Sequence, residues 1–241
     1  NASMISSFFH SFIYTPLYNG LVFLIDFVPG HNVGVAVILL TVAVRVVLYP
    51  LARQAVKTQM AMREIAPKIE ELKKKHKDSQ EELARATFAL YKEHNIRPFS
   101  SFLMLLIQIP LLIGLYWVFW KGGLPQVDAS LLYSFVPNPV QVSMNFLGFF
   151  DMASRSIFLA ALAGGTQLIY ARLSMGERKP APTGERSFTA DLTHSMDLQM
   201  RYILPIMLGG FAYIASAAVA LYFVTSNLFM ILQEYLAGRR F

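Results

Sequence analysis

The sequence predicts an all-α, polytopic membrane protein with five transmembrane helices, an N-terminal interfacial helix and a cytoplasmic helical hairpin. Of its 241 residues, 55% are hydrophobic and 15% are charged, and the mean hydropathy is +0.45. Soluble domains carry about a quarter charged residues. The chain has room for roughly five apolar spans of about 20 residues and their loops, so one integral membrane domain is expected. Cysteine is absent, which excludes disulfides, thiolate nucleophiles and cysteine-ligated metals.

Residues 1–32 form the predicted interfacial segment. Phenylalanines alternate there with polar residues, and Pro16 interrupts the run, so the segment fits a helix lying at headgroup depth. A full transmembrane span is the alternative. Pro29 and Gly30 should end the helix, and no cleavable signal peptide is expected because no positively charged region precedes the first apolar stretch.

The predicted core, residues 33–241, starts with an almost continuously apolar span over residues 33–51 that contains one charged residue, Arg45. Residues 52–97 follow and are rich in lysine and arginine. An excess of these residues marks the cytoplasmic side of a membrane protein.

Residues 52–97 also carry the pattern of two helices that pack on each other. Lys77 and Asp78 are expected to form the turn, and Ser79 with Glu82 fits a capping box, in which each side chain accepts from a free backbone N–H of the other residue. The two predicted apolar stripes are Ile65, Ile69 and Leu72, then Ala84, Phe88 and Tyr91.

Two further spans follow the hairpin. Residues 99–120 form the second, interrupted by Gln108, Pro110 and Gly114, and a partly interfacial external loop leads to the third at residues 156–173. Gly164 and Gly165 in the third span are expected to permit close helix contact.

The last apolar run, residues 202–232, is too long for one ordinary span. Arg201 before it and Arg239 after it both belong on the cytoplasmic side, so two crossings are required. We predict spans at residues 198–215 and 217–236, a locally thinned bilayer, an external N-terminus and a cytoplasmic C-terminus.

Arg45 is the residue that most needs a physical explanation. An arginine at the centre of a spanning helix costs about 2.5–3.5 kcal/mol on insertion scales, so it should face water or a partner. A hydrated cavity is the favoured environment, because Asp26 and Glu234 lie near predicted helix ends. Snorkelling of Arg45 to the cytoplasmic interface is the alternative.

Other polar residues within the predicted spans fit a shared hydrophilic groove with Arg45. Each is also compatible with ordinary hydrogen bonding between helices. They are Gln108, Thr166, Gln167, Thr225, Ser226 and Asn227.

Three segments resemble the YidC family of membrane insertases, which includes mitochondrial and chloroplast relatives. Residues 41–51 (TVAVRVVLYPL) are similar to the first core span, in which an arginine precedes Leu-Tyr-Pro-Leu. Residues 95–110, ending in LIQIP, resemble the second core span, and residues 221–229 (LYFVTSNLF) resemble the last. With the basic hairpin, the resemblance covers the chain from about Tyr14 onward.

The resemblance implies an insertase and chaperone for client membrane proteins, with a groove open to cytoplasm and lipid. Arg45 would attract the polar segment awaiting transfer, and Gln108 and Gln167 match groove-lining positions. Tyr116 and Tyr222 lie on spans that relatives use as a slide for the client helix. Packing or interfacial anchoring is the alternative role for these tyrosines.

The resemblance also implies the partners and the location. Nascent membrane proteins and the lipid bilayer of a bacterial inner membrane are expected partners, and a Sec-type translocon, a ribosome or a targeting receptor are further candidates; no DNA is expected. Lys73, Lys74, Lys75 and Lys77 are candidate contacts for such partners, or a solvated positive-inside loop.

Two other functional classes remain open. A small-anion transporter or channel would also use an intramembrane arginine, although no internal repeat supports it. A metalloenzyme would need clustered ligands, and the best set, Asp191, His194 and Asp197, has weak spacing. No enzyme activity, cofactor or metal is therefore expected, and the absence of a G-x-x-x-x-G-K-[ST] loop agrees with an energy source outside the chain.

Overall fold

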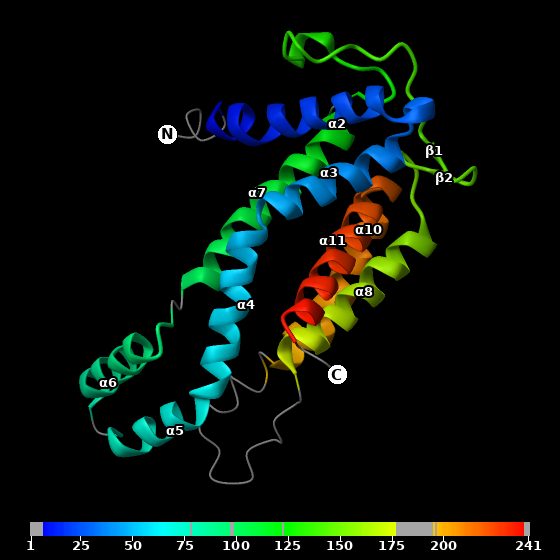
Figure 1. Ribbon diagram of the computed structural model, residues 1–241. Coiled ribbons are helices and arrows are strands. Elements are labelled where there is room, and N and C mark those ends of the chain that lie inside the picture. The colour runs from blue at the N-terminus through cyan, green and yellow to red at the C-terminus, as the bar shows by residue number, and fades with distance from the viewer. Residues whose placement is uncertain are drawn as a thin grey trace. The chain divides into compact units, whose positions relative to one another are not determined.

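The computed structural model describes residues 7–77, 79–96, 99–121, 123–176, 195 and 197–238 (Figure 1). The chain divides into two compact units: Asn1–Val46 with Pro110–Phe241, and Val47–Ile109. The longer helices are α2 (Thr15–Phe27), α3 (Val33–Val47), α4 (Tyr49–Glu64), α5 (Ala66–Lys75), α6 (Gln80–Glu93), α7 (Phe99–Lys121), α8 (Ile157–Met175), α10 (Leu204–Ala215) and α11 (Ala217–Leu236). The short helices are η1 (His10–Tyr14), η2 (Pro29–His31), η3 (Ala129–Leu131) and η4 (Gln199–Ile203).

The N-terminal segment is one helix over Ser7–Phe27, which includes the π-helical turn η1 and α2. Its buried face contacts α7, where a Cβ on Gly114 would lie 2.9 Å from both Ile13 and Leu17. In Figure 1 it runs crosswise to α8, α10 and α11. The predicted break is confirmed, since α2 ends before Pro29 and Gly30 adopts a φ of +76°. The interfacial position of this helix stays a prediction.

The first predicted span is not one continuous helix. α3 ends at Val47 and α4 begins at Tyr49, with Pro50 in the first turn of α4. A proline inside a helix removes a backbone donor and clashes with the preceding turn, whereas the first turn of a new helix tolerates it. The expectation of an uninterrupted span over residues 33–51 is therefore wrong, and the physical reason is Pro50.

The helices α8, α10 and α11 pack against one another in the first unit. Gly164 of α8 meets Gly209 of α10, where a Cβ added to Gly164 would lie 3.5 Å from the Gly209 Cα. The expected close contact at the α8 glycines is thus confirmed for Gly164. The predicted boundary between the last two apolar segments is also confirmed: Ser216 is extended, and its side-chain oxygen accepts from the Val219 N–H at 3.4 Å.

The segment between α7 and α8 contains two strands that the sequence did not signal, β1 (Asn145–Phe146) and β2 (Phe150–Asp151), paired antiparallel. The segment is tied to the helices by hydrogen bonds. Asn19 of α2 donates to the Leu131 carbonyl at 2.8 Å and accepts from the Tyr133 N–H at 2.6 Å. Ala217 at the start of α11 donates to the Ser154 carbonyl at 2.7 Å.

One carboxylate in this connecting segment has a perturbed pKa. The Ser130 hydroxyl donates to Asp128 at 2.6 Å, and the Ser130 N–H donates to the same oxygen at 2.9 Å. These hydrogen bonds favour the charged form and hold the pKa of Asp128 below its ordinary value.

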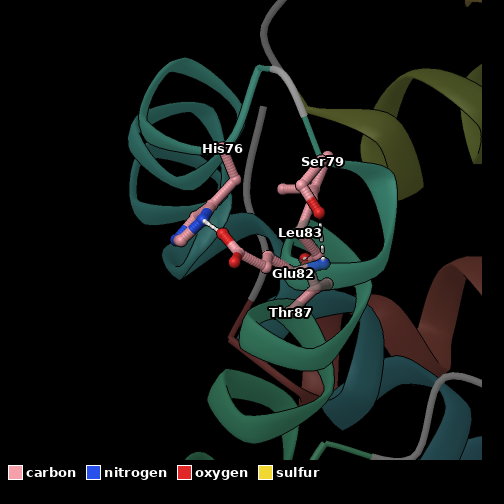
Figure 2. Close-up of polar contacts among 5 residues, drawn as sticks. All are labelled: His76, Ser79, Glu82, Leu83 and Thr87. Atoms are coloured by element: carbon pink, nitrogen blue, oxygen red, sulfur yellow. Dashed lines mark hydrogen bonds and ion pairs between the residues drawn. The ribbon is translucent and has the colours of Figure 1, made fainter.

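In the second unit, α5 and α6 contact each other, and of the predicted turn residues Lys77 is described while Asp78 lies outside the described residues. Figure 2 shows that half of the expected capping box is present: the Ser79 side chain accepts from the Glu82 N–H at 3.3 Å. The other half is wrong. The Glu82 carboxylate contacts His76 Nδ1 at 3.0 Å, and the Ser79 N–H donates to the His76 carbonyl. The nearby imidazole competes for the carboxylate.

The expected apolar stripe of α6 is also corrected. Phe88 is 62% exposed and Ala84 is exposed, while Leu83, Leu90 and Tyr91 are partly buried. Leu83 with Leu90 and Ala84 with Phe88 are both spaced as residues on one face of a helix, so periodicity alone could not predict which face is covered. Leu83 and Leu90 lie on the covered face, and Tyr91 is the member of the expected stripe that is also partly buried.

Three helices are long and apolar enough to cross a membrane among the described residues: Ser7–Phe27, Ile157–Met175 and Ala217–Leu236. The α3–α4 pair makes a fourth if it is one bent span. α7 has a shorter apolar part, Ile107–Trp120, and α10 has 12 residues. The helical, multi-span class is supported, while the count of five stays a prediction.

Candidate intramembrane polar site

Arg45 lies near the end of α3, and its side chain is 3% exposed. Its Nε donates to the Ser226 hydroxyl at 2.9 Å, and Nη2 contacts the same oxygen. Ser226 lies in the middle of α11 (Ala217–Leu236) and is itself buried. Arg45 therefore faces a partner on α11, an arrangement that disfavours the snorkelling alternative.

The predicted residues Thr166 and Asn227 are brought together by the packing of α8 on α11. Asn227, 1% exposed, donates through Nδ2 to Thr166 Oγ1 at 3.1 Å and to the Ala163 carbonyl at 3.2 Å. Thr166 in turn donates to the Leu162 carbonyl at 2.7 Å. These two residues form interhelical hydrogen bonds, the alternative that the sequence left open.

The polar contacts of Arg45 and Thr166 converge on α11. Ser226 faces α3, while its neighbour Asn227 faces α8. Successive residues of an α-helix point about 100° apart, so α11 presents one polar side chain to each flanking helix. The guanidinium has five N–H donors, and a serine hydroxyl satisfies donors without cancelling the charge.

The two predicted glutamines lie in different units. Gln167 of α8 is buried beside Thr166 in the first unit. Gln108 of α7 is partly buried in the second unit. The shared groove that the sequence predicted for both glutamines with Arg45 stays a prediction.

The predicted slide tyrosines take part in a run of aromatic contacts across α7, α10 and α11. Tyr116 stacks on Trp120, with ring centroids 5.6 Å apart, and lies 6.2 Å from Phe211. Phe211 meets Phe223 edge-on at 6.3 Å, and Phe223 contacts Tyr222 at 5.3 Å. Tyr116 is partly buried and Tyr222 is 1% exposed, so Tyr116 is the more accessible of the two.

The four predicted lysines lie at one end of α5. Lys73, Lys74 and Lys75 occupy its last turn, Lys77 follows in the turn, and all four are exposed. Cations at a helix C-terminus interact favourably with the partial negative charge there. The four lysines are therefore compatible with the end of the helix, and because they are exposed they are accessible to an anionic partner.

The candidate metal set lies largely outside the described residues, which include neither Asp191 nor His194. Asp197 is described, and its carboxylate accepts from Arg201 Nη2 at 3.1 Å. Across the described part of the chain, no group of three potential metal ligands is found.

The sequence did not predict that two charged residues, Arg201 and Glu234, are buried. Arg201 donates to the Gly176 carbonyl at 2.8 Å as well as to Asp197, linking η4 to the end of α8. The i, i+4 spacing of Asp197 and Arg201 was an available signal. Glu234 is also buried, being 1% exposed, although it lies near the end of α11.

Comparison with known proteins identifies the family to which these helices belong. Residues 23–241 match the family described as 60Kd inner membrane protein. The chain belongs to this family. The match covers every segment that carried the resemblance to YidC-type proteins, and that resemblance is confirmed.

Three relatives show how far the family likeness extends. A membrane protein insertase YidC of Clostridium tetani is 34% identical over 213 residues, which cover 88% of this chain and 84% of the relative. One of Oceanobacillus iheyensis is 30% identical, covering 87% and 76%. A membrane protein insertase MisCA of Bacillus subtilis is 28% identical, covering 95% and 78%. Together with the apolar helices, the family places the chain among multi-pass inner membrane proteins.

Proposed function

We propose that this chain is a membrane protein insertase, which transfers polar segments of newly made membrane proteins and releases their apolar helices into lipid. The observation that carries the proposal is the burial of Arg45, which lies in a segment similar to the family's first core span and donates to Ser226 of α11. The names of the relatives support the same function. No chemical transformation is required, so the proposed role is not enzymatic.

The proposed groove contains Arg45, Gln108, Thr166, Gln167 and Asn227 and opens to cytoplasm and lipid. A fixed positive charge in a medium of low dielectric attracts an acidic or polar client segment more strongly than it would in water. Ser226 supports this role because it accepts from Arg45 and thereby orients the guanidinium. Hydration of the groove would lower the cost of moving a polar tail past the apolar helices.

Helix lengths support limited thinning of the bilayer. η4 and α10 cover residues 199–215, about 25 Å at ~1.5 Å per residue, against a hydrocarbon core of ~30 Å. α11 has 20 residues, about 30 Å, and needs no thinning. The proposed thinning is therefore local to α10, where each Å of mismatch costs a fraction of a kcal/mol.

The driving force would come from the client itself. Burying apolar surface in lipid yields about 25 cal/mol per Å², so one client helix offsets a short polar passage without ATP. We infer that Tyr116, partly exposed beside Trp120, contacts the client first, and that Tyr222 joins after a rearrangement of its aromatic neighbours.

The inferred topology has an external N-terminus along the membrane interface, five crossings and a cytoplasmic C-terminus. The exposed phenylalanines of the first helix, Phe8, Phe12, Phe23 and Phe27, support an interfacial position because aromatic side chains favour headgroup depth. In the same topology α5 and α6 form the cytoplasmic hairpin. Its lysines are then available to anionic lipid, a ribosome, a targeting receptor or a Sec-type translocon.

The test is insertion of a small single-span client into liposomes that contain the purified protein. Protection of the translocated tail from protease is compared among wild type, Arg45→Ala, Arg85→Ala and empty liposomes. Arg85 is the matched control because it is an exposed arginine, paired with Glu81 on α6. We expect strong protection with wild type and Arg85→Ala, and reduced protection with Arg45→Ala.

Solute flux is measured on the same liposomes. Protection no greater than in empty liposomes, with anion flux that depends on Arg45, would replace the insertase proposal with the channel alternative.

A further inference from the structure

An apolar groove lies between α8 and α10 on the first unit, away from the polar contacts of α11. Its lining is almost wholly hydrocarbon and backbone, with a volume of about 570 Å³. That volume is in the range of pockets that hold small molecules. The lining includes Ile157, Ala161, Gly165 and Leu168 of α8, and Gly210 and Tyr213 of α10.

Two pairs of glycines create the groove, and each pair has a different role. Gly164 and Gly209 bring the two backbones together. Gly165 and Gly210 line the space beside this contact, and a Cβ added at either would meet no heavy atom within 4 Å. The groove is therefore open volume rather than a contact already filled by the protein.

The groove is about as long as one leaflet is thick. From Ile157 to Leu168 the axis of α8 rises about 16 Å at ~1.5 Å per residue. Half of a ~30 Å hydrocarbon core is about 15 Å. Since α8 begins at Ile157, one end of the groove lies at the start of the helix and the other near its middle.

A cation marks the end of the groove where α8 begins. Arg155 is exposed, and its guanidinium carbon lies 6.0 Å from the ring centroid of Tyr213, which lines the groove. The neighbouring Asp151 carboxylate accepts from Ser154 Oγ and the Ala153 N–H, and among the described residues Arg155 has no ion pair. A guanidinium suits a phosphate because its donors match two oxygens at once.

We propose that this groove binds one acyl chain of an anionic phospholipid, whose headgroup phosphate pairs with Arg155. The apolar lining and leaflet length fit the chain, and Arg155 supplies the complementary charge at the depth where α8 begins. A partner helix without an acidic side chain at this depth fits less well, because it would bury Arg155 without a counter-charge. The inference needs only that α8 spans the membrane, and it does not rest on insertase activity.

The experiment measures spin-labelled phosphatidylglycerol and phosphatidylcholine around the reconstituted protein by electron paramagnetic resonance. Motionally restricted lipid is counted for wild type, Arg155→Gln and Gly165→Leu. The controls are Arg85→Gln, an exposed arginine on α6, and Leu162→Met, a change on α8 outside the groove lining.

We expect wild type to prefer phosphatidylglycerol several-fold, Arg155→Gln to lose that preference, and Gly165→Leu to lose about one restricted lipid of either kind. Both controls should match wild type. Unchanged selectivity in Arg155→Gln, or an unchanged lipid count in Gly165→Leu, would overturn the proposal.

The competing occupant, a second copy of this chain, is tested separately. The sequence contains no cysteine, so Ala161→Cys introduces a single thiol in the groove. Efficient disulfide dimers at low protein-to-lipid ratio would show that the groove belongs to a protein interface and would overturn lipid binding. Only background cross-linking, with the lipid selectivity above, supports it.

Discussion

Arg45 and Arg85 place the same side chain in two different environments. Arg45 is 3% exposed and donates to the hydroxyl of Ser226, whereas the Arg85 side chain is 80% exposed and pairs with Glu81 at 2.6 Å one turn away. An exposed i, i+4 ion pair contributes only about 0.3–0.5 kcal/mol because water and salt screen it. The formally stronger contact, an ion pair, is thus expected to matter less than the buried one.

The largest expected effect is that of Arg45→Ala on clients with acidic tails. We expect their insertion rate to fall roughly tenfold, about 1.4 kcal/mol in the barrier, while neutral-tail clients change by less than about twofold. The charge acts on the tail, and Ser226 can redirect its hydroxyl to a carbonyl of its own helix. The measurement is the initial rate of tail protection, with Arg45→Lys retaining part of the preference. An equal loss for both tails would make Arg45 a structural residue.

The second prediction concerns α6, which is exposed. Loss of the Ser79 cap is expected to cost more stability there than loss of the Arg85–Glu81 ion pair. Ser79→Ala should destabilise the start of α6 by about 1 kcal/mol, because the Glu82 N–H loses its side-chain acceptor. Amide hydrogen exchange over residues 79–93 measures this loss. Ser79→Asp is the control and should retain protection, and unchanged exchange in Ser79→Ala would show that the cap contributes nothing.

The third prediction tests the buried hydrogen bond between α8 and α11. Asn227→Leu and Thr166→Val should show a coupling of about 0.6 kcal/mol in a double-mutant cycle, since hydrogen bonds between membrane helices are modest. Unfolding in mixed micelles supplies the four free energies of unfolding. A coupling near zero would mean that these residues only pack, and would weaken the contrast between buried and exposed polar contacts.

The smallest expected effect is that of Arg85→Ala. Its cost should be about 0.3 kcal/mol and should vanish in high salt, because both members of the pair are exposed. Hydrogen exchange over α6 at low and high ionic strength measures it. A loss above about 1 kcal/mol would place Arg85 in a network larger than the pair with Glu81.

Much of the helical layout was predictable because it depends on local signals. Pro29 and Gly30 end α2. Because both cationic ends of the last apolar run are expected on the cytoplasmic side, the run must cross twice, and the break was predicted between residues 215 and 217, where Ser216 is extended. The same local reasoning failed where two signals competed. Pro50 divided the expected first span, and in α6 Leu83 and Leu90 are partly buried while Ala84 and Phe88 of the expected stripe are exposed.

The sequence by itself determined which polar residues would lie within the apolar helices, because composition and spacing are properties of the chain alone. Only the tertiary structure decided their partners: Ser226 for Arg45, Asn227 for Thr166, and the Leu131 carbonyl for Asn19. Such pairs join residues far apart in the sequence. Their formation depends on the rotation of each helix about its axis and on the distance between backbones, which close packing sets and no single segment encodes.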